Sequence, residues 1–123
     1  MKNVLCIALV AAFAAGTANA ACTYPKAPEK IPDGGSATLE EMITAQRAVK
    51  QFDADITAYQ NCVETEFSDA MAKEASLTEE QKKERRKIVD QKLNAAVDDA
   101  QGLADRLNAQ IRVYKEKAAA KKN

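Results

Sequence analysis

Residues 38–63, TLEEMITAQRAVKQFDADITAYQNCV, decide the fold of this chain. No glycine or proline occurs from Thr38 to about Lys73, and Thr38 and Glu41 have the spacing of a capping box. Apolar side chains recur at alternating spacings of three and four residues, which is typical of a helix with a coiled-coil seam. The stretch therefore predicts a helix over about 38–73, with its seam at Met42, Ala45, Val49, Phe52, Ile56, Tyr59 and Val63.

A second helix is predicted over about 77–118. It follows the residues SLTEEQ at 76–81, in which either Ser76 with Glu79 or Thr78 with Gln81 can form a capping box. The same three-and-four spacing then returns, with a four-residue stutter after Leu107. This second seam comprises Val89, Leu93, Ala96, Ala100, Leu103, Leu107, Ile111, Tyr114 and Ala118.

The phase of the two seams indicates a hairpin rather than one long helix. The second seam is two residues out of frame with the first, which a break near Ser76 explains. Antiparallel pairing about that break places large residues opposite small ones, for example Phe52 opposite Ala100 and Ala45 opposite Leu107. The fold class expected for residues 38–123 is all-α, an antiparallel two-helix coiled-coil hairpin.

Two different segments precede the hairpin. Residues 21–37 hold Pro25, Pro28, Pro32 and the pair Gly34–Gly35, so no helix can run through them and an extended N-terminal strap is expected. Residues 1–20 have the pattern of a signal peptide: a basic residue, an apolar run of about twelve residues that is shorter than the ~20 a membrane span needs, and small residues before the predicted cleavage after Ala20. This predicts a mature chain in the periplasm, or one that is secreted.

Two cysteines, Cys22 and Cys62, remain after that cleavage. Cys62 lies 24 residues after Thr38, roughly 36 Å of helix, and the 16 residues from Cys22 to Thr38 can span up to roughly 50 Å. An intramolecular disulfide is therefore feasible if the strap lies along the helix, and it would contribute about 4 kcal/mol in the chain-entropy model. Intermolecular pairing, an unpaired Cys62 acting as a reactive thiol in an enzyme or redox protein, and acylation of Cys22 remain open, although Asn19 departs from the usual lipobox.

A possible interaction stripe lies beside the second seam and consists of Val97, Ala104 and Ile111. Because it widens the apolar face of the helix, either the strap or a second protomer must cover it. The partner expected is therefore another protein or a second copy of the chain. The mature chain has 17 basic and 18 acidic residues, since Lys2 leaves with the signal peptide, and this balance argues against a nucleic acid or an anionic membrane as partner.

No constellation for catalysis is visible, and we expect no enzyme activity, cofactor or small-molecule substrate. The chain has no histidine to activate a serine or cysteine nucleophile and no Cys-x-x-Cys metal motif. Two groups of acids have the chemistry to bind a hard cation weakly: Asp98, Asp99 and Asp105, and Glu64 with Glu66. Acids spaced along a solvated helix are the simpler interpretation, so no metal site is predicted.

One short motif resembles a known family. Residues 77–81, LTEEQ, match the LTxxQ signature of the Spy/CpxP family of small helical periplasmic chaperones and stress regulators, in which the motif generally occurs twice. Here it occurs once, and a capping box alone also explains it. Residues 22–25, 32–34 and 59–62 are more loosely similar to uncharacterised small exported helical proteins of Gram-negative bacteria. These resemblances imply export and helices, and the first implies a chaperone or envelope-stress role.

The cleavage and the disulfide can be tested together by intact mass spectrometry. Protein purified from its native compartment should have a mass that begins at Ala21 and is lower by two hydrogens than the sum for the reduced chain. Measurement with and without reductant and alkylating agent distinguishes this from the alternatives. Two free thiols, a disulfide-linked dimer or an acylated Cys22 would contradict the prediction.

Overall fold

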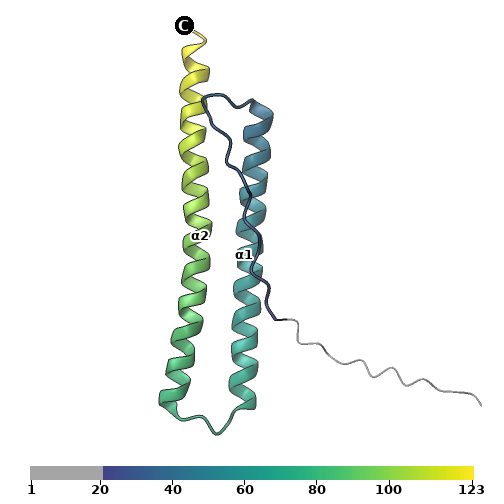
Figure 1. Cartoon of the computed structure of the whole chain (residues 1–123), viewed down its shortest axis with the longest axis vertical. Helices are drawn as coiled ribbons and strands as arrows, with labels where there is room; N and C mark the ends of the chain where they lie inside the picture. Colours follow the sequence, from purple (N-terminus) through teal and green to yellow (C-terminus); the bar gives the residue numbers. More distant parts are fainter. Residues whose placement is uncertain (1–20) are drawn as a thin grey trace, which may run out of the picture.

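The computed structural model describes residues 21–123, and the predicted signal peptide lies outside this range. It contains two helices, α1 (Leu39–Lys73) and α2 (Glu79–Ala120), and no strand among the residues described. The helices run side by side in opposite directions, joined by a short connection (Figure 1). The prediction of an all-α chain with two helices packed against each other is confirmed.

Both helices begin at capping boxes. The Thr38 hydroxyl accepts from the amide of Glu41 at 3.2 Å, and the Glu41 carboxylate accepts from the amide of Thr38 at 2.7 Å. Thr78 and Gln81 make the same reciprocal pair at 3.2 and 2.9 Å. Of the two caps that residues 76–81 allow, the structure therefore forms the later one, and α2 begins two residues after the predicted position.

The core is a single seam between the helices. Ala96 is completely buried, and its small side chain lets the helices approach closely where the larger residues of α1 pack. Part of the predicted seam is less buried than expected. Its last residue, Ala118, is exposed because α2 extends beyond the start of α1 there, and five others are only half-buried: Tyr59, Val89, Leu93, Ile111 and Tyr114. The buried cluster consists of Met42, Ala45, Val49, Phe52 and Ile56 from α1 with Ala96, Ala100, Leu103 and Leu107 from α2.

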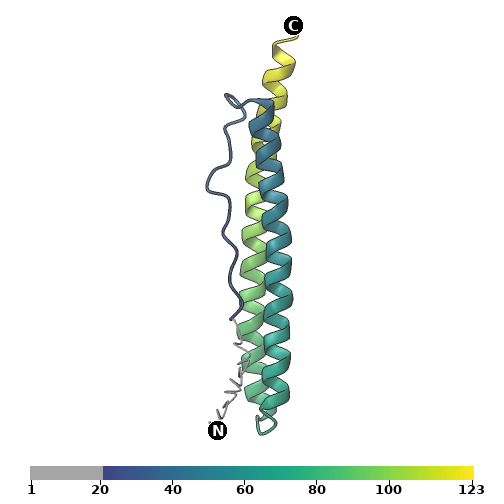
Figure 2. The same cartoon turned by 90° about the vertical axis from the view of Figure 1, so that its right-hand side faces the viewer.

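Residues 21–37, called the strap below, form no helix or strand and run along one face of the helix pair (Figures 1 and 2). A turn reverses the chain before α1: the carbonyl of Asp33 accepts from the amides of Ser36 and Ala37 at 3.0 and 2.8 Å. The amide of Gly34 donates to the side chain of Gln110 at 2.9 Å, and Lys117 donates to the carbonyl of Gly35. The turn is therefore attached to the C-terminal part of α2, more than 70 residues away in the sequence.

Position 34 has room only for glycine, because the backbone of α2 lies directly against it. The residue is buried, and a Cβ atom on it would lie 2.0 Å from the carbonyl oxygen of Gln110 and 2.8 Å from the amide nitrogen of Tyr114. Both are backbone atoms that cannot rotate away. Gly102, in the middle of α2, has nothing within 4 Å of the corresponding position.

We expect opposite effects from two glycine-to-alanine substitutions. Gly34→Ala should destabilise the protein by about 1–3 kcal/mol, because the turn must move off α2. Gly102→Ala should stabilise it by about 0.5–1 kcal/mol, because alanine is the better helix former and has room. Urea unfolding followed by circular dichroism measures both, and equal stabilities for the two variants would contradict the close docking of the turn.

Candidate functional site

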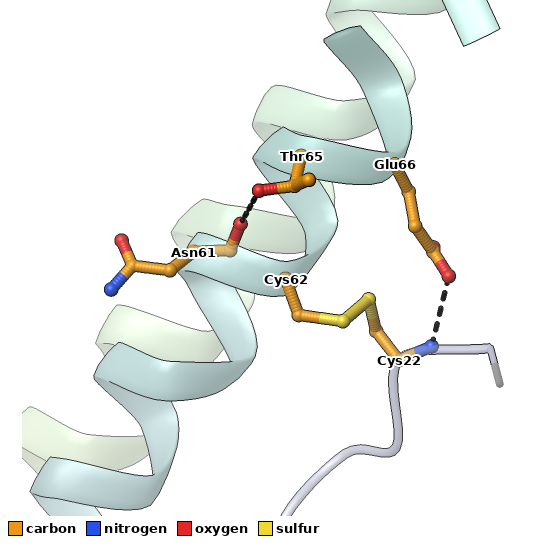
Figure 3. Close-up of a disulfide and its surroundings, with 5 residues drawn as sticks. All are labelled: Cys22, Asn61, Cys62, Thr65 and Glu66. Atoms are coloured by element: carbon orange, nitrogen blue, oxygen red, sulfur yellow. Dashed lines mark hydrogen bonds between the residues drawn. A yellow bond between two sulfur atoms is a disulfide. The ribbon is translucent and has the colours of Figure 1, made fainter. Parts of the chain in front are cut away.

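The most distinctive local chemistry lies where the strap meets α1. Cys22 and Cys62 form a disulfide, with their Cα atoms 5.8 Å apart (Figure 3). Cys62 directly precedes the buried Val63, so its side chain leaves α1 at the edge of the seam, where the strap passes. The bond joins residues 40 positions apart, which corresponds to about 4 kcal/mol of stabilisation in the chain-entropy model.

Glu66 lies beside this disulfide. It is one helical turn after Cys62, and its carboxylate accepts a hydrogen bond from the backbone amide of Cys22 at 3.2 Å (Figure 3). The two sulfur atoms and a carboxylate oxygen of Glu66 all lie within 4.8 Å of one another. From the sequence, Glu66 is a candidate cation ligand only together with Glu64. Its four-residue spacing from Cys62 puts the two side chains on one face of α1, but only the path of the strap brings Cys22 to them.

Tyr24 attaches the strap to both helices. Its ring makes an edge-on contact with the ring of Tyr59 on α1, with centroids 5.0 Å apart, and its hydroxyl donates to Asp99 on α2. Burial of the phenol and this hydrogen bond to a carboxylate raise the pKa of Tyr24 to about 12. Tyr24 still keeps 42% of its surface exposed, so solvent screens the effect of this interaction on stability.

Two of the acids considered above as ligands of a hard cation, Glu64 and Asp99, have protein partners. Arg86 donates to both carboxylate oxygens of Glu64 at 2.8 Å and also contacts Asp90, and its hydrogen bonds hold the pKa of Glu64 below its usual value. Asp99 accepts from Tyr24. Arg86 also lies over the ring of Phe67, 5.3 Å from its centroid, so this ion pair joins the two helices near their connection.

A groove of about 780 Å³ lies between the strap and the first turns of α1. Its apolar wall consists of Ile31, Pro32, Ala45 and Ala48. The charged residues around it are Lys30, Asp33, Glu40 and Glu41. The Asp33 and Glu41 carboxylates are both engaged, with the Gly35 amide and with Thr38 respectively. These bonds lower the pKa of both acids, so both carboxylates stay ionised at neutral pH.

The stripe of Val97, Ala104 and Ile111 lies on the flank of α2 that faces away from the strap. At about 100° per residue, these side chains are separated from Asp99 and Gln110, which bind the strap, by roughly 100–160° around the helix axis. All three are half-buried, and Ala104 and Ile111 pack against the core. The strap thus covers one flank of the hairpin (Figure 2), and the stripe belongs to the other.

No protein-family model, no curated protein and no solved structure matches this chain. No helix within residues 21–123 is both long and apolar enough to cross a membrane.

The Tyr24 hydroxyl makes a pH-dependent contribution to stability. Because its pKa is raised in the folded protein, the contribution is complete below the unfolded value near 10 and is lost as the pH rises towards about 12. Tyr24→Phe keeps the ring contact and removes the hydrogen bond, so it should cost at most about 1 kcal/mol at pH 8. The difference in Tm between wild type and Tyr24→Phe should shrink between pH 10 and 12. A difference independent of pH would contradict a stabilising role for the Tyr24 hydroxyl.

Proposed function

We propose that this chain is a small periplasmic protein that acts by contact with another protein and has no catalytic role. The observation that carries the proposal is the flank of the hairpin opposite the strap. There the stripe residues of α2 are accompanied by two exposed side chains of α1, Leu39 at 59% and Ile43 at 37% exposure. Ile43 directly follows the seam residue Met42, on the side of α1 away from Ala48 and the groove.

The oligomeric partner we infer first is a second copy of the chain. A two-helix seam forms a narrow core, and proteins of this size usually gain stability from a staple or from association. The disulfide and the strap support only one flank. In a symmetric dimer the same flank of two hairpins would pack together and bury Leu39, Ile43 and Ile111 in a four-helix arrangement, with each hairpin a two-stranded antiparallel coiled coil.

The disulfide supports an oxidising compartment. Structural disulfides persist in the periplasm and outside the cell and are rare where thiols are kept reduced. Together with the signal-peptide pattern at residues 1–20, this favours a periplasmic or secreted protein. The near balance of acidic and basic residues continues to argue against nucleic acid as the partner.

The alternative is a Spy/CpxP-like chaperone or envelope-stress protein, in which the apolar flank would receive unfolded clients. The cap of α2 by itself accounts for Thr78 and Gln81 of the motif at residues 77–81, so the motif gives the chaperone hypothesis no further support. Export and helices are common to both proposals. The difference is whether the flank binds one folded partner or many unfolded ones.

Sedimentation of two matched variants tests the proposal. Ile43→Lys places a charge on the proposed interface and should weaken self-association by roughly tenfold or more, since the ammonium group must lose its hydration. Ile88→Lys is the control. Ile88 is also exposed, at 49%, but it directly precedes the seam residue Val89 and so lies on the other side of the seam from the proposed interface. A wild-type protein that stays monomeric across micromolar concentrations, or equal behaviour of the two variants, would contradict the dimer.

A further inference from the structure

We propose that reduction of the Cys22–Cys62 disulfide creates a binding site for a thiophilic cation of the Zn²⁺ type, with Glu66 as the third ligand. Two thiolates and one carboxylate are a donor set that suits zinc, with a fourth position left for water. In the oxidised protein the sulfurs are bonded to each other and offer no thiolate. The site is therefore available only to the reduced protein, and it does not depend on the proposed dimer.

The distances fit such a site. Zinc–sulfur bonds of about 2.3 Å in tetrahedral geometry place two sulfurs roughly 3.8 Å apart. The two sulfurs and the Glu66 oxygen already lie within 4.8 Å of one another, so side-chain rotations can form the site once the disulfide is broken. Cys62 and Glu66 project from the same face of α1, four residues apart, and Cys22 closes the site from the strap.

The strap has other attachments that hold Cys22 in place after reduction. Two residues further on, Tyr24 contacts Tyr59 on α1 and donates to Asp99 on α2. The Cys22 amide itself donates to Glu66, and the far end of the strap is bound through Gly34 to Gln110. The two thiols of the reduced protein thus stay close to each other instead of separating with a free chain end.

The redox step balances with a dithiol as the reductant. The reductant is oxidised to its own disulfide and supplies two electrons and two protons, and the Cys22–Cys62 bond becomes two thiols. Binding of the cation then releases the two thiol protons, because the thiolate is the ligand. Since the cation binds only the reduced form, it stabilises that form by mass action and makes the disulfide easier to reduce.

Cadmium is the probe of choice, because its bonds to thiolates give an ultraviolet charge-transfer band. The mature protein would be reduced, freed of reductant under nitrogen and titrated with Cd²⁺. One Cd²⁺ per chain should bind with this band, and the oxidised protein should show none.

Glu66→Gln should weaken binding by at least about tenfold, the scale seen when the support of a metal site is removed. Asp69→Asn removes an exposed acid from the same helix and should leave affinity unchanged.

A second variant tests the role of the strap. Tyr24→Ala removes the neighbouring attachment and should weaken Cd²⁺ binding to the reduced protein, while circular dichroism shows that the helices remain. Absence of the band in reduced wild-type protein, folded or unfolded, would overturn the proposal. So would an affinity of Glu66→Gln equal to that of wild type, or one Cd²⁺ shared between two chains.

Discussion

The seam between α1 and α2 is the constraint on which the rest of the structure depends. Ala96 and Ala100 on α2 leave space for the bulkier side chains of α1, such as Phe52 and Ile56, so the helices can pack closely over many turns. This fixed separation allows the strap to contact both helices at once. Tyr24 reaches Tyr59 on one helix and Asp99 on the other only because the two helices are held at this distance.

The strap makes the two flanks of the hairpin different. Its prolines keep it extended, so its residues span most of the distance along α1 without secondary structure of their own. It is attached near one end by the disulfide and Tyr24, and at the other by Gly34 against Gln110. One flank is thereby covered and joined covalently, and the other keeps its partly exposed apolar side chains. The proposed cation site and the proposed dimer interface therefore lie on opposite flanks of the hairpin.

The charged contacts near the connection between the helices orient α2 relative to α1 more than they stabilise the folded protein. Arg86 pairs with Glu64 and Asp90, and Arg85 with Glu74, but each of these side chains is at least two-fifths exposed. Exposed ion pairs contribute little free energy individually, because water competes for the same groups. Their geometry still ties the start of α2 to the end of α1, in a region where Val89 and Leu93 are only half-buried.

Local patterns in the sequence determined the helices, and long-range contacts determined the site. Capping boxes and apolar spacing act over three or four residues, so α1 and α2 could be placed within two residues of their observed ends, and their packing followed from the phase of the two seams. The flank chosen by the strap, the partners of Tyr24 and the position of Glu66 beside the sulfurs could not be predicted in this way. A chain without periodicity carries no signal of which face it will cover. That choice depends on contacts such as Gly34 with Gln110, which join residues 76 positions apart and exist only once the helices have packed.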